Sequence, residues 1–222
     1  MADPAPPDPT APRREWRRSL TAVRDALLGS ATPRPLLDDV QRRHPGFVEA
    51  VTADARVTAS YRHEVFAPRS SVDAAWQIVR LALISDAFLA LCCYRAEARC
   101  RTRRVPVLPD LLHRLSMMTA QVCIGPPVLV QPGLYLPHGQ VVVDGFVELG
   151  TGVVLSPFVV VGLRAGESKG PTIGRRARIG AGAKVIGPVE VGEGAVVGAN
   201  AVVVDDVAPG VTVVGSPARP VR

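Results

Sequence analysis

One histidine in this sequence stands where an otherwise strict repeat is interrupted. The histidines are His44, His63, His113 and His138, and only His138 falls among the repeats of the C-terminal half. An imidazole titrates near neutral pH, so it can take a proton from an alcohol or an amine. Residue type alone favours the alternative, a histidine at a surface turn. The interruption of the repeat keeps His138 as a candidate general base.

The repeat itself has a period of six residues and runs from Val143 to Val203, with only Glu167 breaking the apolar series. The anchors are Val143, Leu149, Leu155, Val161, Ile173, Ile179, Val185, Val191, Val197 and Val203. A period of six matches neither a helix nor an alternating strand, but it suits stacked three-sided coils with small residues at the corners. We predict an α+β protein, a helical N-terminal region followed by a left-handed parallel β-helix. The alternative, a valine-rich β-sandwich, would not keep a strict hexad.

Two irregularities interrupt the repeat. Ile124, Val130 and Leu136 are in phase with one another, whereas the series from Val143 is one residue out, so the phase slips in the segment that contains His138. The second irregularity, residues 162–172, is rich in glycine and charge and predicts an extruded loop. Interruptions of a regular pattern are where function most often intervenes.

The chain divides into four predicted parts. Residues 1–13 are rich in proline and predict a disordered lead, and residues 14–121 predict a helical domain. Helices are expected over 14–28, over 36–62 with a break near Pro45-Gly46, over 72–101 and over 109–121. Residues 122–208 then form the predicted β-helix, and 209–222 a C-terminal extension.

Composition limits the partners. The net charge is +6, which is compatible with nucleic acid binding and equally compatible with a basic rim for an anionic small molecule, but the sequence has no aromatic and basic surface of the kind that reads nucleic acid. One histidine within the repeats does not supply a zinc site, and the four cysteines have no metal-ligand spacing. The apolar run 78–93 is short for a membrane span, and no signal region opens the chain. We expect a soluble cytoplasmic protein without a metal, a nucleic acid or a membrane partner.

Three segments carry a resemblance to a known family. They resemble the serine acetyltransferases, a family of hexapeptide-repeat acyltransferases. The segments are VCIGPPVLVQPGLYLPH, IGAGAKVIGPVEVGEGAVVGANAVV and VVGSPARPV. The resemblance covers residues 75–222. In that family an aspartate precedes the catalytic histidine by fifteen residues, and Cys123 precedes His138 by the same fifteen.

The resemblance implies transfer of acetyl from acetyl-CoA to the hydroxyl of L-serine or a similar small metabolite, in cysteine biosynthesis. His138 would be the general base, and a backbone N–H at a coil corner would stabilise the oxyanion. Ala181 and Gly182 would line the pantetheine groove between subunits, and Lys184 and Arg219 would meet the phosphates of coenzyme A. The family also implies a homotrimer, or a dimer of trimers. The alternatives are a plain corner glycine at position 182 and solvated surface charges for the two basic residues.

Several positions depart from the family pattern. Cys123 replaces the aspartate that orients the base, and Pro137 replaces an aspartate that helps to hold the amino group of serine. Gly170 stands in place of a second active-site histidine. Neither Asp144 nor Glu148 can be assigned as a new partner of His138 from the sequence. Two alternatives therefore stay open: an O-acetyltransferase for a sugar or secondary-metabolite acceptor, and a catalytically silent trimeric scaffold.

Overall fold

The structure is a computed structural model that describes residues 34–221. The expected lead over 1–13 and the expected helix over 14–28 lie outside the described residues. Residues 37–222 form one unit of the chain.

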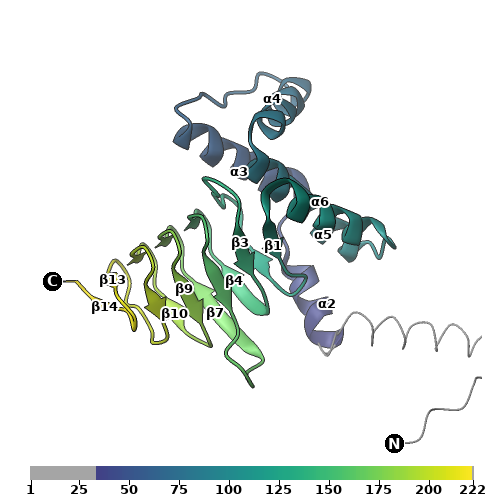
Figure 1. Cartoon of the computed structure of the whole chain (residues 1–222). Coiled ribbons are helices and arrows are strands. Elements are labelled where there is room, and N and C mark those ends of the chain that lie inside the picture. The colour runs from purple at the N-terminus through teal and green to yellow at the C-terminus, as the bar shows by residue number, and fades with distance from the viewer. Residues whose placement is uncertain (1–33, 222) are drawn as a thin grey trace, which may run out of the picture. The chain divides into compact units, whose positions relative to one another are not determined.

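Short parallel strands stack into three sheets, which the chain visits in turn (Figure 1). The first sheet contains β1 (Val122–Ile124), β3 (Val141–Val143), β6 (Val160–Gly162), β9 (Lys184–Ile186) and β12 (Val202–Val203). The second contains β2 (Leu129–Val130), β4 (Phe146–Leu149), β7 (Lys169–Ile173) and β10 (Glu190–Val191). The third contains β5 (Val154–Leu155), β8 (Arg178–Ile179), β11 (Val196–Val197), β13 (Thr212–Val214) and β14 (Arg219–Pro220). One visit to each sheet makes one coil of a β-helix.

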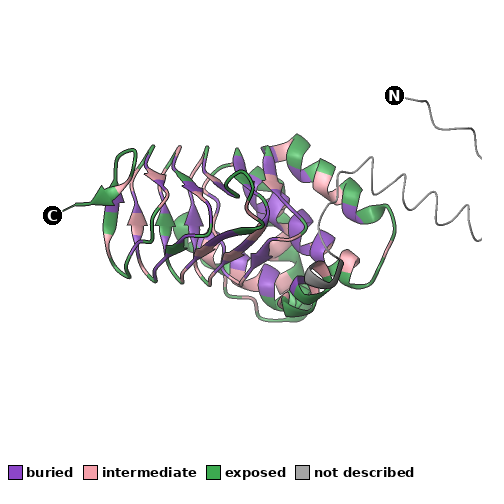
Figure 2. Ribbon diagram, turned by 90° about the horizontal axis from the view of Figure 1, so that it is seen from below, coloured by how far each residue is buried: buried purple, intermediate pink, exposed green. Residues whose placement is uncertain are grey.

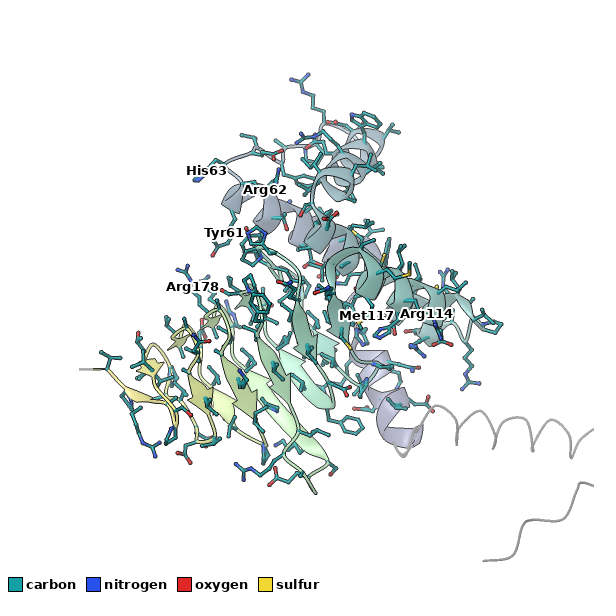
Figure 3. All side chains as sticks on the ribbon, in the orientation of Figure 1. Tyr61, Arg62, His63, Arg114, Met117 and Arg178 are labelled. Atoms are coloured by element: carbon teal, nitrogen blue, oxygen red, sulfur yellow. The ribbon has the colours of Figure 1, made fainter. Side chains whose placement is uncertain are left out.

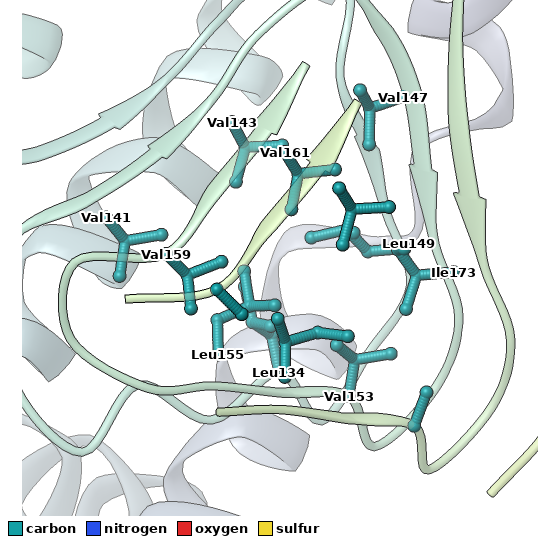
Figure 4. Close-up of a cluster of buried hydrophobic side chains, with 14 of the residues drawn as sticks. Leu134, Val141, Val143, Val147, Leu149, Val153, Leu155, Val159, Val161 and Ile173 are labelled. Carbon is teal, nitrogen blue, oxygen red and sulfur yellow. The ribbon is translucent and has the colours of Figure 1, made fainter. Parts of the chain in front are cut away.

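The hexad anchors fill the inside of the coils, as the sequence predicts. Val143, Leu149, Leu155 and Val161 are each no more than 1% exposed and face one another across the coil (Figure 4). The same buried stripe continues along the stacked strands (Figure 2). Burial of a column of aliphatic side chains is the main stabilising contribution of such a coil.

Strand pairing locates both irregularities. Cys123 of β1 pairs with Val142 of β3, nineteen positions on, whereas Val142 pairs with Val160 of β6, eighteen positions on. The first coil therefore holds one extra residue, which is the predicted phase slip. Val160 pairs with Lys184 of β9, twenty-four positions on, so one coil carries six additional residues between β6 and β7. This is the predicted extruded loop.

The last coil reaches further than expected. β13 pairs in parallel with β11, Val197 opposite Val213, so the stacked strands continue to Val214 rather than stopping near residue 208. β14 then turns back and pairs antiparallel with β13.

Helices precede the coils. They are α2 (Arg34–Arg43), α3 (Phe47–Tyr61), α4 (Ser71–Ile84), α5 (Asp86–Thr102) and α6 (Leu108–Ala120). The break near Pro45-Gly46 is confirmed, but the single helix expected over 72–101 is wrong. Ser85 has an extended backbone, and its hydroxyl accepts a hydrogen bond from the Phe88 N–H, so it ends α4 and caps α5.

A buried ion pair joins the helices to the first coil. Arg95 of α5 donates to both carboxylate oxygens of Asp54 of α3, at 2.8 and 3.2 Å. The same guanidinium donates to the carbonyls of Val130 and Gln131, at 2.6 and 2.9 Å. Asp54 also accepts the backbone N–H groups of residues 133 and 134. The segment that leads to His138 is thereby held against α3 and α5.

The imidazole of His44, between α2 and α3, is expected to make the fold less stable at acid pH. Burial and the nearby Arg95 guanidinium lower the pKa of His44 from 6.5 to about 4. Between these values the unfolded chain binds a proton there and the folded chain does not, so the free energy of unfolding falls as the pH drops from 6.5 to 4. The contribution is at most about 3 kcal/mol.

Urea unfolding of the wild type and His44→Gln at pH 7.5 and pH 4.5 measures this contribution. The substitution should flatten the fall in unfolding free energy between the two pH values. An equal fall in both proteins would contradict the assignment.

Candidate active site

His138 lies at a corner between the third and the first sheet. The chain leaves the third sheet at Tyr135, which bridges to Val154, and enters β3 at Val141. Gly139 presses against the preceding helix end, because a Cβ there would lie 1.7 Å from the Ala120 carbonyl oxygen. The corner backbone is therefore fixed, while His138 beside it is exposed.

The next corners along the same edge of the β-helix lie directly over this one. The Phe158 N–H donates to the Gln140 carbonyl at 2.7 Å, and the Gly182 N–H donates to the Pro157 carbonyl at 2.9 Å. We call these stacked corners, centred on Gln140, Phe158, Gly182 and Asn200, the corner column; all four residues have positive φ. His138, Ala181 and Gly182 thus share one edge, with the corner of Phe158 between them.

The glycine at 182 has a local structural reason. Its φ is +71°, and a Cβ there would lie 2.1 Å from the side-chain oxygen of Asn200, one coil further on. The corner-glycine alternative therefore explains its type without a ligand. Ala181 is exposed beside it, and a role in a cofactor groove stays a prediction for both residues.

The two predicted phosphate-binding residues differ in their surroundings. Lys184 follows the corner column in β9, is exposed, and donates to the Gly182 carbonyl at 3.1 Å. Arg219 of β14 forms an exposed ion pair with Asp205 at 2.8 Å. Neither contact is buried, so both cations can exchange these partners for a phosphate.

None of the residues considered as partners of the base is paired with it. Asp144 follows β3 and lies on the edge between the first and second sheets, and Glu148 is paired with Arg43 at 2.7 Å. Within residues 34–221 no hydrogen bond of the His138 ring is found. The corner is supported instead by Tyr135, three residues earlier, whose ring stacks on that of Tyr61 with 4.1 Å between centroids. Figure 3 labels Tyr61 at the end of α3.

Cys123 takes part in a group that the sequence did not single out. Its sulfur lies 4.0 Å from Nε2 of His113, and Nδ1 of that ring lies 3.4 Å from the Glu97 carboxylate. The three residues come from β1, α6 and α5. Their sequence separations match no helical period, and only the packing of α5 on α6 and β1 brings them together.

Residues 34–221 contain no cluster of three or more His, Cys, Asp or Glu side chains arranged to hold a metal ion. Among the helices that the structure describes, none has the length and apolar character needed to cross a membrane.

Stacked hexads closed into a β-helix behind a set of helices are the architecture of a hexapeptide-repeat transferase. The family profile described as "Bacterial transferase hexapeptide (six repeats)" matches residues 170–205. The chain is 36% identical over 148 residues to a serine acetyltransferase of Helicobacter pylori, which covers 65% of this chain and 84% of the relative.

Solved structures agree with the sequence match. Serine acetyltransferase of Neisseria gonorrhoeae in complex with serine has a TM-score of 0.66 at 28% identity, over 78% of this chain and 68% of that one. The soybean serine acetyltransferase apoenzyme has a TM-score of 0.67 at 26% identity, over 94% and 93%. The chain belongs to the serine acetyltransferase family. It is an acyltransferase with a left-handed β-helix, so the predicted fold class and enzyme class are confirmed.

Proposed function

We propose that the protein moves the acetyl group of acetyl-CoA to the hydroxyl of L-serine or a similar small metabolite, with His138 as general base. The observation that carries the proposal is the corner column. It places an exposed imidazole on the same edge as Ala181 and Gly182 in a member of this family. The serine bound to the Neisseria gonorrhoeae relative supports serine as the acceptor.

In this mechanism His138 takes the proton of the acceptor hydroxyl as the oxygen attacks the thioester carbonyl. The carbon–sulfur bond breaks and the thiol leaves. A general base of this kind contributes about 10²–10⁴-fold to the rate. A backbone N–H of the corner column would stabilise the oxyanion.

One position favours a second acceptor class. Gly170, which replaces the family's second active-site histidine, is buried in β7, and a Cβ there would lie 2.9 Å from a Val147 methyl and 3.0 Å from the Phe146 carbonyl oxygen. A larger side chain does not fit this backbone, so the contact that the histidine would make to the acceptor has no counterpart at this position. An O-acetyltransferase for a sugar or a secondary-metabolite acceptor is therefore the second candidate.

An acceptor panel separates the candidates. The protein is incubated with acetyl-CoA and serine, homoserine, threonine or monosaccharides, and release of free thiol is followed. Serine as the best acceptor supports the first proposal, and a sugar with a much higher kcat/KM supports the second. If free thiol is released at the same rate with and without every acceptor, the result supports the catalytically silent scaffold.

The acceptor site is proposed to be completed by a neighbouring subunit of a homotrimer. Val142 and Phe158, next to the corner of His138, are 40% and 60% exposed, and apolar side chains on the surface are covered at interfaces. Further exposed apolar residues on α4, Trp76 and Leu83, fit contact between two trimers. Analytical ultracentrifugation should give three or six chains per particle.

Lys184→Ala is expected to raise the KM for acetyl-CoA by about three- to tenfold, with little change in kcat. The reason is that an exposed ammonium contributes about 1 kcal/mol to binding a phosphate and does not touch the reacting atoms. Arg178→Ala is the matched control, an exposed cation on the third sheet. Equal KM changes in the two variants would contradict a specific contact at Lys184.

A further inference from the structure

We propose that a groove between α2, α3 and α5 binds a small organic diphosphate, of the class of the nucleoside diphosphates, and that the bound ligand lowers the rate of acetyl transfer. None of the residues that line the groove belongs to the corner column. The effect on transfer rests on the proposed function, whereas the binding of the ligand does not.

Two adjoining cavities make up the groove, which we call the arginine groove. The first has a volume of about 280 Å³, and its lining includes Arg42, Arg95 and Arg99. The second has a volume of about 430 Å³, shares Phe47 and Arg99 with the first, and adds Arg103. Together the cavities fall within the range of about 300–1,000 Å³ that is typical of small-molecule sites.

Positive charge predominates in the arginine groove. Its lining contains four arginines and a single carboxylate, that of Glu49. Arg42 is engaged in an exposed ion pair within α2. Arg99 and Arg103, one helical turn apart at the end of α5, have no ion pair within residues 34–221. Guanidinium groups match the geometry of phosphate oxygens, so two of them one turn apart suit a diphosphate.

Arg95 brings a buried donor to the first cavity. Its side chain is 2% exposed, and a guanidinium has five N–H groups. The N–H on Nε and one N–H on Nη2 are donated to the Asp54 carboxylate. The other N–H on Nη2 is donated to the Gln131 carbonyl, and one on Nη1 to the Val130 carbonyl. The second N–H on Nη1 therefore has no partner among the described residues, and a phosphate oxygen in the cavity would satisfy it.

Polar groups around the junction of α2 and α3 complete the first cavity. Burial, and then the nearby Arg95 guanidinium, lowers the pKa of His44 to about 4, so at pH 7 the ring is neutral and offers one N–H. Gln41 and Thr102 add an amide and a hydroxyl to the lining. Gly46 begins α3 without a side-chain cap, so the first N–H groups of this helix add a further favourable contribution for an anion.

The second cavity suits the organic part of such a ligand. Phe47 lines both cavities and is 38% exposed. Its phenyl ring and the guanidinium of Arg103 are surfaces on which a planar ring stacks. A diphosphate in the first cavity would leave an attached ring over Phe47. A nucleoside diphosphate has both parts, whereas inorganic phosphate has only one.

Arg95 connects the arginine groove to the candidate active site. Its guanidinium holds the carbonyls of Val130 and Gln131, in the segment that leads to His138. A diphosphate beside Arg95 competes with these carbonyls for the same guanidinium, and this competition loosens the segment. Occupancy of the groove should therefore lower kcat for acetyl transfer.

The binding test uses guanosine diphosphate (GDP), because an adenosine phosphate resembles part of coenzyme A and would also enter the cofactor site. Titration calorimetry of the full chain should show saturable binding of GDP. Arg99→Gln and Arg103→Gln should each weaken binding by about tenfold or more, since each loses a charge-assisted hydrogen bond to phosphate. The matched control is Arg56→Gln, which replaces an exposed arginine of α3 outside the groove and should bind like the wild type.

Two binding results would overturn the site. One is the absence of saturable GDP binding to the wild type. The other is an equal loss of affinity in Arg99→Gln and Arg56→Gln, which would show a diffuse attraction of GDP by the net positive charge.

Steady-state kinetics test the connection to the active site. Saturating GDP should lower kcat by about fivefold or more and leave the KM for acetyl-CoA unchanged. In Arg99→Gln the GDP concentration that gives half of this effect should rise with the loss of affinity. Competition between GDP and acetyl-CoA would place GDP at the cofactor site and overturn the inference. GDP binding that leaves kcat unchanged would overturn the effect on transfer.

The outcomes also separate this inference from the proposed function. If the wild type acetylates a hydroxyl acceptor but GDP does not bind, the arginine groove is overturned as a site and the proposed function stands. If GDP binds through Arg99 but no hydroxyl acceptor is acetylated, the proposed function fails and the diphosphate site stands.

Discussion

His138→Ala is expected to lower acceptor-dependent transfer from acetyl-CoA by about 10²–10⁴-fold, the range that a positioned general base contributes. The side chain is exposed at its corner, and the structure holds that corner through Gly139, Gln140 and Tyr135 rather than through the imidazole. The melting temperature should therefore stay close to that of the wild type. Thiol release with saturating acceptor, compared with release without acceptor, measures the effect.

The matched control is His63→Asn, which replaces another exposed histidine, in the turn after α3. Asparagine tolerates the positive φ of 58° at this position, so the exchange does not strain the backbone. It should leave transfer within about twofold of the wild type. Equal losses in the two variants, or full activity of His138→Ala, would remove the imidazole from the mechanism.

The sequence predicted the coils well because their side chains obey one rule at every sixth position. Val143 and Leu149 must fill the inside of a coil whatever else the chain does, so the pattern is local and can be read residue by residue. The extra residue near His138 shows in the same pattern as a change of phase. The strand pairing confirms the change of phase, because Cys123 lies opposite Val142 and not opposite Val141, where an uninterrupted repeat would place it.

Contacts between segments that are far apart in the sequence leave no periodic pattern of residue types. The break at Ser85 depends on one hydroxyl that caps α5, and the apolar residues on both sides concealed it. The Glu97–His113–Cys123 group requires a helix pair and a strand to pack at particular angles. Cys123 stands at the position of the family's aspartate, but the contact of its sulfur with His113 depends on how the helices pack on β1.

Arg95→Met is expected to lower the free energy of unfolding by about 3–5 kcal/mol, the loss typical of breaking a buried ion pair from one side. Arg95 and Asp54 are 3% and 1% exposed, so the substitution leaves a carboxylate buried without its counter-ion. It also removes the donors that satisfy two carbonyls of the first coil. Chemical denaturation followed by circular dichroism measures the change. Arg43→Met, which breaks the exposed pair with Glu148, is the control and should cost at most about 1 kcal/mol.

Replacing both partners, as in Asp54→Leu with Arg95→Met, tests what the pair is for. An isolated buried pair can be exchanged for apolar residues with little loss, because the two desolvated charges vanish together. Here the charges also serve four backbone groups of residues 130–134, of which the Gln131 carbonyl is half-buried and the other three are buried, and the double variant removes this partner from all four. Each buried backbone group that loses its hydrogen bond costs about 1–3 kcal/mol, so we expect the double variant to be no more stable than Arg95→Met. Since this segment leads into the corner of His138, acetyl transfer should also fall under conditions where the double variant is folded. A stable and fully active double variant would show that the corner of His138 holds its position without the helices.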